Sequence, residues 1–324
     1  MNVTYIIGNG FDLNLDLKTG YQDFYDYYIG VPSSNSHVEL LKNAIMHDRY
    51  ELWSDLEVGL GKISAEFETV EDFIAALEDV SDHLRKYITN INNGVQIEQY
   101  DADRFRSDLC NPAKYLVEAD RFNLQSLYKV TNSTWNVNII SFNYTNVVQK
   151  LLNFNNISSV KIGTNPVQGL TQIRKIEHVH GDIDGTILVG VNDIEQIEKN
   201  TFRENIDLLE MFVKPRANDV IGKRLIDKCR TIINESHLIC IFGHSMGLTD
   251  KIWWNQIKDN IMKRDCRLIL FIYNKNIDVT HREYLRSRIK RQYIQKLGWS
   301  ENMSQRIYIG LNTDIFNLKS KTTN

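Results

Sequence analysis

The sequence predicts an α/β protein built on a Rossmann-like, doubly wound parallel sheet, and three features of the chain predict it. Short runs rich in Ile and Val recur along the chain, and most are continuous rather than alternating, which is typical of strands buried on both faces of a parallel sheet. Several runs are followed by helical patterns, as βαβ units require. The first run ends in a glycine-containing turn, and the turn after the first strand is where doubly wound sheets bind dinucleotides.

The expected strands are bounded by glycine or polar residues. In chain order they are Val3–Gly8, Val137–Asn143, His178–Gly181, Ile187–Gly190, Leu238–Gly243, Leu268–Asn274 and Ile307–Gly310. Because the carboxyl ends of parallel strands meet at one edge of a sheet, we expect the polar residues that end these strands to line one ligand site.

The longest interval between expected strands, residues 14–135, has the periodicity of helices. Four aromatic residues fall at i, i+3, i+4 and i+7 behind a Thr19-x-x-Gln22 capping box, which predicts an amphipathic helix. These residues are Tyr21, Phe24, Tyr25 and Tyr28. Helix-like spacing continues at Phe67, Phe73, Ile74, Leu77, Leu84, Tyr87 and Ile88. We predict a single α/β domain over residues 1–324, with a helical insertion at residues 14–135 packed beside the carboxyl edge of the sheet.

Composition narrows the class of protein. Lys+Arg 38 against Asp+Glu 41 gives a net charge of -3, so neither nucleic acid nor an anionic membrane is indicated as a partner. No apolar run reaches the roughly 18 residues of a membrane span, and the first residues lack the charged segment of a secretion signal. The four cysteines form no C-x-x-C pair; they are Cys110, Cys229, Cys240 and Cys266. We expect a reduced, cytoplasmic protein.

The turn after the first strand reads Gly8-Asn9-Gly10-Phe11-Asp12-Leu13. Glycines at positions 8 and 10 allow a sharp turn and a close approach to a phosphate, to which backbone N–H groups donate. The third glycine of a G-x-G-x-x-G motif is replaced by Leu13, so a plain structural turn remains an alternative. Asp12 either interacts with a sugar or serves as a helix N-cap.

Polar residues also end the two following strands. Asn143, in Ser141-Phe142-Asn143-Tyr144-Thr145, is either a ligand-binding residue or a strand cap. His178 and His180 share one face of an ideal strand, so they are able to converge on one ligand. His180 suits the role of a general base near neutral pH.

Two other catalytic patterns compete with this interpretation. His178-x-His180-x-Asp182 is similar to the metal-binding signature of metallo-β-lactamase-fold hydrolases, although Ile183 stands where that family has a further His. That alternative is a metal-dependent hydrolase or nuclease.

The second pattern is Gly243-His244-Ser245-Met246-Gly247, which matches the G-x-S-x-G nucleophile elbow of α/β-hydrolases. Its triad would need Asp278 and His281, which are only three residues apart, and no HGGG-type segment is present. Ser245 is equally suited to bind a ligand's hydroxyl or phosphate.

Together these motifs resemble the AbiH abortive-infection family of bacterial antiphage proteins. The resemblance rests on four blocks that span nearly the whole chain in order. They are residues 6–13 with 17–24, Ser141–Thr145, His178–Gly181 and Gly243–Asp250. Membership implies an antiphage role and an unknown phage trigger or partner protein, and it leaves open whether the protein forms a homo-oligomer.

The AbiH family is distantly similar to sirtuins, and this similarity implies NAD as the ligand. Gly8 and Gly10 stand at the place of the sirtuin NAD loop, and His180 precedes Gly181 as the sirtuin catalytic His precedes a Gly. The sirtuin T-Q-N-x-D motif has its counterpart around Asn143, with Thr145 in place of the Asp. The implied catalytic residues are Asn143 and His180. The implied cofactor-binding residues are Gly8, Asn9, Gly10, Phe11, Asp12, Gly243, Ser245 and Asn274.

The four-cysteine zinc module of sirtuins is missing, and no acyl-lysine site is recognisable, which disfavours protein deacylation. We therefore predict an effector that binds NAD and hydrolyses it to nicotinamide and ADP-ribose, without a metal. A nucleotide-binding sensor without turnover, signalling through the helical insertion, is the alternative from a different class.

Overall fold

The computed structural model describes residues 1–47, 56–130, 134–221, 224–277 and 283–319. Within these residues the chain forms a seven-stranded sheet in the order β3-β4-β2-β1-β5-β6-β7. The strands are β1 (Asn2–Ile7), β2 (Trp135–Ser141), β3 (Val160–Thr164), β4 (Leu170–His178), β5 (Leu238–Phe242), β6 (Arg267–Ile272) and β7 (Ile307–Leu311). All neighbours are parallel except the antiparallel pair β3 and β4. The prediction of an α/β protein with a mostly parallel sheet is confirmed.

The strand order changes direction at β1. Strands β2 and β4 lie to one side of β1, and β5, β6 and β7 lie to the other. Ile7 at the end of β1 is in register with Ser141 of β2 and with Phe242 of β5, so the three carboxyl ends are adjacent. A change of direction of this kind is where open parallel sheets form ligand crevices.

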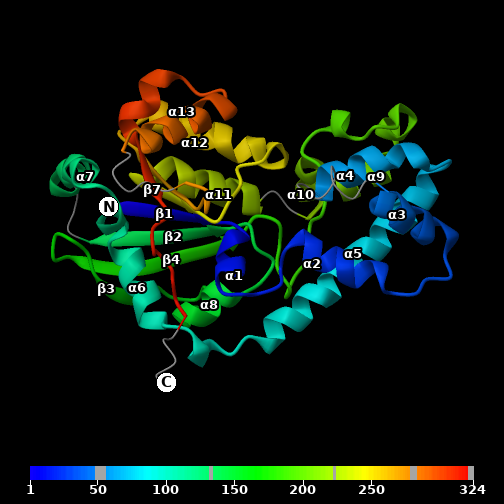
Figure 1. The fold of residues 1–324 in the computed structure, drawn as a ribbon, viewed down its shortest axis with the longest axis horizontal. Helices are drawn as coiled ribbons and strands as arrows, with labels where there is room; N and C mark the ends of the chain where they lie inside the picture. The colour runs from blue at the N-terminus through cyan, green and yellow to red at the C-terminus, as the bar shows by residue number, and fades with distance from the viewer. Residues whose placement is uncertain (48–55, 131–133, 222–223, 278–282, 320–324) are drawn as a thin grey trace.

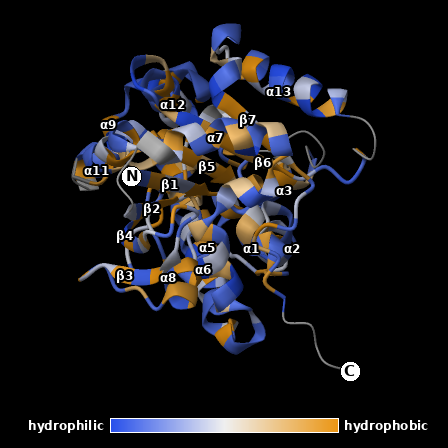
Figure 2. Ribbon diagram, turned by 90° about the vertical axis from the view of Figure 1, so that its left-hand side faces the viewer, coloured by the Kyte–Doolittle hydropathy of each residue, from blue (hydrophilic) through white to orange (hydrophobic). Residues whose placement is uncertain are grey.

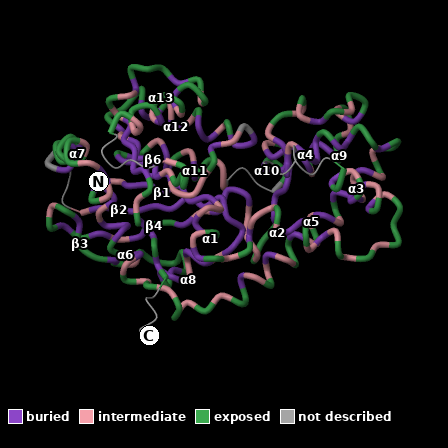
Figure 3. Tube along the Cα trace, viewed as in Figure 1, coloured by how far each residue is buried: buried purple, intermediate pink, exposed green. Residues whose placement is uncertain are grey.

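Helices cover both faces of this sheet (Figure 1). On one face lie α11 (Arg224–Glu235), α12 (Lys251–Lys263) and α13 (Tyr284–Lys296), and on the other α6 (Ala102–Cys110), α7 (Glu118–Val130) and α8 (Val147–Leu152). Double coverage explains the continuous apolar strands: Tyr5 and Ile7 pack on one face, whereas Ile6 packs on the other. The central strands are hydrophobic and buried along their length (Figures 2 and 3). Together we call the sheet and these helices the body.

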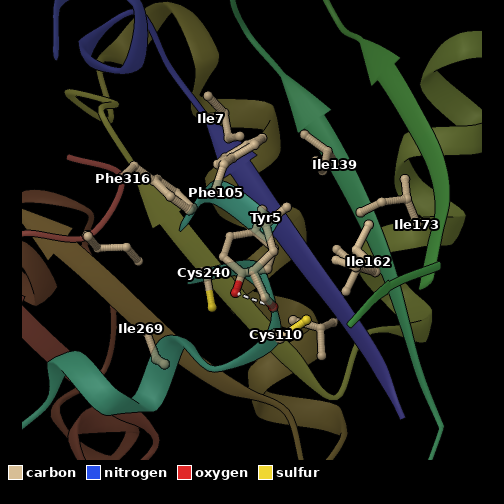
Figure 4. Packing of buried hydrophobic residues seen from close by; sticks show 14 of the residues in the cluster. Tyr5, Ile7, Phe105, Cys110, Ile139, Ile162, Ile173, Cys240, Ile269 and Phe316 are labelled. Carbon is tan, nitrogen blue, oxygen red and sulfur yellow. Dashed lines mark hydrogen bonds between the residues drawn. The ribbon is translucent and has the colours of Figure 1, made fainter. Parts of the chain in front are cut away.

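One face of the body core is centred on Tyr5 (Figure 4). The Tyr5 hydroxyl donates to the carbonyl of Leu109 in α6 at 2.9 Å. This hydrogen bond satisfies the one polar group of the buried Tyr5 side chain. Phe105 and Phe316 pack nearby, with ring centroids 5.0 Å apart. Helix α6 is therefore a fixed part of the body.

The remaining helices form a second part, which we call the lobe, beyond the carboxyl ends of the strands (Figure 1). It consists of α2 (Tyr21–Ile29), α3 (Ser36–His47), α4 (Leu56–Ile63), α5 (Val70–Gly94), α9 (Ile206–Phe212) and α10 (Lys214–Ile221). All of these helices except α10, which packs against α9, share one hydrophobic core with residues between Ile187 and Phe202. The predicted insertion thus contributes to both parts, because α6 and α7 return to the sheet.

Several local predictions differ from the structure. The strand expected at His178–Gly181 overlaps β4 (Leu170–His178) only at its last residue, and Ile187–Gly190 is not a strand. Strand β3 was not predicted because its exposed edge position leaves only Ile162 buried, with no continuous apolar run. Helix α2 begins after Gly20 without a side-chain cap, because the Thr19 hydroxyl donates instead to Asn9 Oδ1 at 2.6 Å. Phe67 precedes α5 rather than lying in a helix.

No helix in the described residues has both the length and the apolar character needed to cross a membrane.

Candidate functional site

The turns that follow β1 and β5 press against each other at the carboxyl edge. Gly8 N–H donates to the Phe242 carbonyl at 2.9 Å, and Gly10 N–H donates to the Gly243 carbonyl at 2.7 Å. A Cβ at Gly10 would lie 2.6 Å from Gly243 Cα, and Gly243 itself has a φ of 67°. The glycines permit this approach. Because both amide groups have backbone partners, the geometry does not support the phosphate-donating role predicted for them.

Asp12 lies in the short helix α1 (Gly10–Asn14) and joins it to the end of β2. Its buried carboxylate accepts from Asn143 Nδ2 at 2.9 Å and from Thr145 Oγ1 at 2.7 Å. Burial raises the pKa of Asp12 to about 6, and the two hydrogen bonds oppose that rise. Asp12 is therefore not the N-cap of α1, since its side chain bonds across the site.

Asn143 is fixed by this carboxylate. A carboxylate only accepts, so the Asn143 amide must turn its NH₂ group to Asp12 and its Oδ1 away. Oδ1 is buried and has no hydrogen-bond partner within the described chain. Asn143 and Asp12 line a cavity of about 70 Å³, and Asn9 lines it too. An unsatisfied acceptor beside a cavity is available to a ligand's donor.

His178 supports Asn143 from behind. Its Nδ1 is 2.7 Å from the Asn143 carbonyl oxygen, and its Nε2 faces Gln149 Nε2 at 2.5 Å. The carbonyl requires a protonated Nδ1, so Nε2 accepts from the Gln149 amide. Burial lowers the pKa of His178, which keeps the ring neutral. Both ring nitrogens are thus used in holding the β2–α8 turn.

His180 has different partners, because β4 ends at His178 and the alternation of a strand no longer applies. Its Nε2 is 3.0 Å from Asp250 Oδ1, and the ring is edge-on to Phe142. Burial and the nearby Lys214 lower the pKa of His180. Burial raises the pKa of Asp250, but Lys214 and His180 outweigh it and hold that pKa well below its usual range. A neutral His180 therefore donates through Nε2 and keeps a lone pair on Nδ1.

A buried chain of charges continues from this pair into the lobe. Lys214 Nζ is 3.4 Å from Asp250 Oδ1 and 2.7 Å from Glu57 Oε2. Burial alone would lower the pKa of Lys214, but Glu57 and Asp250 raise it, so the ammonium stays charged. Glu57 belongs to α4 and Lys214 to α10. Sequence reasoning missed both residues because they are 157 positions apart and carry no local motif.

His244 and Ser245 lie in the turn after β5. His244 Nδ1 accepts from Met246 N–H at 2.8 Å, and its Nε2 lies 3.6 Å from Asp250 Oδ2. Ser245 is exposed, and its carbonyl accepts from Lys296. The other proposed triad members, Asp278 and His281, lie outside the described residues.

A larger pocket of about 590 Å³ opens on the other side of the glycine contact. Gly10, Gly243 and Ser245 line it. Further lining comes from the aromatic residues Phe242, Phe271, Tyr273 and Tyr293, the polar Asn14 and Thr313, and the basic Lys319. Its size and mixed lining are those of small-molecule sites.

The structure thus divides the predicted residues. Gly10, Gly243 and Ser245 line the larger pocket, whereas Asn9, Asp12 and Asn143 line the smaller cavity. Gly8 serves the contact between turns. Phe11 packs with Phe105, Phe242 and Phe316 and is fully buried, so its side chain belongs to the core. Asn274 is exposed and bonded to Asn312, outside both linings.

The metal-binding alternative finds no matching cluster. His178 and His180 face different partners, and the Asp182 carboxylate accepts from the Asp184 N–H at 3.1 Å. Across the part of the chain that the structure describes, no three His, Cys, Asp or Glu side chains are grouped as a metal site.

The sequence model of a family described as "Bacteriophage abortive infection AbiH" matches residues 4–273. The matched range extends from β1 to the end of β6 and includes Asp12, Asn143, His180 and Asp250. A search of curated proteins found no match.

Proposed function

This chain belongs to the AbiH family of bacteriophage abortive-infection proteins, and from that premise we propose that it is an effector that binds NAD and hydrolyses it to nicotinamide and ADP-ribose. The family suggests the bacterial antiphage role. The observation that carries the chemistry is the buried His180–Asp250 pair, whose imidazole packs edge-on to Phe142 directly after β2. The proposal includes a sirtuin-like arrangement of the Rossmann-like sheet, with the helical insertion after its first strand.

The larger pocket is the proposed site for the adenosine end of the dinucleotide. Its volume of about 590 Å³ lies within the range of ligand pockets, roughly 300–1,000 Å³. Tyr273 and Tyr293 offer rings for an adenine, and Ser245 offers a hydroxyl for the pyrophosphate. Lys319 adds a cation, which the pyrophosphate would share with Asp16 at 2.7 Å. These donors replace the amide groups of Gly8 and Gly10, which already have partners.

The reaction breaks the bond between the nicotinamide nitrogen and C1′ of its ribose. Water adds to C1′, nicotinamide leaves with the bonding electron pair as a neutral molecule, and the water's proton passes to His180 Nδ1. Asn143 Oδ1, which lacks a donor in this structure, accepts from a ribose hydroxyl or from the attacking water. Asp250 stabilises the imidazolium that forms, because its carboxylate lies 3.0 Å from Nε2.

The test is incubation of the purified protein with NAD, followed by chromatographic measurement of nicotinamide. Asn143→Ala and His180→Ala should each lower turnover by roughly 10²–10⁴-fold and remove toxicity in cells. Ser245→Ala is the matched control at the same sheet edge. It should raise KM and leave most of kcat, because an exposed hydroxyl contributes only to binding.

The other outcomes assign other functions. NAD that binds with micromolar affinity but stays intact would identify a nucleotide sensor. Ester cleavage with fluorophosphonate labelling of Ser245 would identify a serine hydrolase instead. Turnover that appears only after a divalent metal is added, and is lost in His178→Ala and His180→Ala alike, would favour the metal-dependent hydrolase.

A further inference from the structure

We infer that Lys214, held in place by Glu57, is a positioning residue for His180: the lobe uses it to fix the Asp250 carboxylate that orients the imidazole. The inference rests on the proposed function in one respect, which is that His180 is the base. The inference gives the lobe a role in the reaction, because Lys214 and Glu57 belong to the lobe and not to the sheet.

The contacts form one continuous path. Asp250 Oδ1 lies 3.0 Å from His180 Nε2 and 3.4 Å from Lys214 Nζ, so a single oxygen accepts from both groups. Lys214 in turn reaches Glu57 Oε2 at 2.7 Å. All three side chains of this path from the lobe to Asp250 are at most 10% exposed, so water does not compete for these contacts. A shift of α4 or α10 would therefore move the acceptor that holds His180.

The backbone ties Lys214 to the segment that carries His180. Lys214 N–H donates to the Val191 carbonyl at 2.9 Å, and Val191 N–H donates to the Phe212 carbonyl at 2.8 Å. Leu188 N–H, three residues earlier, donates to the His180 carbonyl at 2.8 Å. The side-chain contacts through Asp250 and these backbone hydrogen bonds thus both connect α10 to the segment that begins at His180. Lys214 therefore has little freedom to move independently of His180.

The charges around His180 define what Lys214 does. Asp250 faces its ring directly, His244 lies on the far oxygen of Asp250, and Lys214 and Glu57 lie behind Asp250. The Tyr144 ring is 6.4 Å away, with its hydroxyl donating to the Leu188 carbonyl. Two carboxylates and one ammonium give this group one net negative charge when the imidazoles are neutral. Removing the ammonium doubles that charge and favours a protonated His180, which has no lone pair to act as a base.

The experiment is an NMR titration of the His180 imidazole in full-length protein, assigned by its disappearance in His180→Gln. Lys214→Met should raise the pKa of His180 by about one pH unit. Lys214→Arg should keep it near the wild-type value because the positive charge remains. Glu57→Gln should lower the pKa of His180, since it removes a negative charge and Lys214 then pairs with Asp250 alone.

Lys42→Met is the matched control. Lys42 is as buried as Lys214, at 2% against 6% exposed, and it also lies in the lobe, where its Nζ contacts Glu39 and the Val31 carbonyl. Its loss should lower stability without moving the pKa of His180. The Glu57→Gln arm keeps the inference testable if Lys214→Met fails to fold, because that variant retains the lysine.

Activity separates this inference from the proposed function. If the wild-type protein does not hydrolyse NAD, the proposed function fails, and the titration, which needs no substrate, still decides the role of Lys214. If NAD is hydrolysed, the acid limb of the kcat profile should move upward in Lys214→Met by the same pH interval as the titration. A His180 pKa that is unchanged in both Lys214→Met and Glu57→Gln would overturn the inference.

Discussion

The body and the lobe are built differently, although they share the site. The body packs aliphatic strands between helices, and its polar site residues come from strand ends. The lobe has no strand among its described residues and packs its helices around one core, in which Phe73 contacts Phe67 and Phe202 at centroid distances of 5.1 and 6.0 Å. It contributes to the site a pair of buried charges, and Tyr21 and Ile88 line the smaller cavity. The body therefore places the candidate reactive groups, and the lobe sets the electrostatic environment in which they act.

The first and largest test of this division concerns the joint between the two parts. Lys214→Leu leaves Glu57 and Asp250 buried without their cation, which should lower the free energy of unfolding by about 3–5 kcal/mol. The double variant Glu57→Leu/Lys214→Leu should lose less than Lys214→Leu alone, because one uncompensated charge is removed as well. Urea denaturation measures the double variant and the two single variants, Lys214→Leu and Glu57→Leu. A double variant that loses as much as the two single variants added together would show that packing rather than charge joins the parts.

The second test concerns the body alone. The pKa of Asp12 is raised to about 6 from 3.8, so the folded protein binds this proton more tightly than the unfolded chain. The protonated carboxyl thus favours folding at low pH, and that contribution is lost as pH rises through about 6. Relative to Asp12→Asn, the wild-type free energy of unfolding should fall by about 2–2.5 kcal/mol between pH 4 and pH 7.

Denaturation curves at several pH values for wild type and Asp12→Asn give this difference directly, with the other titrating groups cancelling. A difference that rises with pH would mean that the hydrogen bonds from Asn143 and Thr145 outweigh the burial of the carboxylate.

The third test compares one glycine from each part. Gly10→Ala should cost about 1–3 kcal/mol, because its Cβ would lie 2.6 Å from the Gly243 backbone and the two turns would have to separate. Gly94→Ala, at the end of α5, has nothing within 4 Å of the new Cβ and should change stability by less than about 1 kcal/mol. Thermal unfolding followed by circular dichroism measures both. Equal effects would show that the contact between the turns is not tight.

The smallest expected effect lies in the lobe. Thr69 caps α5 by accepting from the Asp72 N–H at 3.2 Å, so Thr69→Ala should cost about 1 kcal/mol, whereas Thr69→Ser should be nearly neutral. Amide exchange in the first turn of α5 reports the change locally. If exchange near His180 accelerates equally, the lobe and the body open as a single unit rather than separately.

The sequence predicts β1, β2, β5, β6 and β7 well and the β3–β4 side of the sheet poorly. Strands β1, β2 and β5 are covered on both faces, so a continuous apolar run identifies each one within about two residues. Strand β3 lies at an edge, and its alternating, mostly exposed residues give no such run. The same limit explains the error over His178 and His180, since no local pattern indicates that β4 ends between them.

The site is predictable only in its local part. Asp12, Asn143 and His180 follow strands and can be identified from their neighbours in the sequence, and the structure brings Asp12 and Asn143 into contact. Phe11 precedes Asp12 in α1, but its side chain is buried in the core on one face of the sheet. Glu57 and Lys214 lie in no recognisable motif, since their role depends on a contact between residues 157 positions apart. Their roles can be inferred only from the fold.

The central position of β1 has a consequence for how the protein is made. Its two neighbours, β2 and β5, begin at Trp135 and Leu238, so the ribosome delivers the first strand long before its partners. At roughly 5–20 residues per second, β1 waits on the order of ten seconds or more for β5 to emerge. Throughout that time both edges of an apolar strand are unpaired, the condition in which nascent chains associate with one another or are shielded by chaperones. The yield of active protein should therefore depend on the rate of translation between residues 8 and 242.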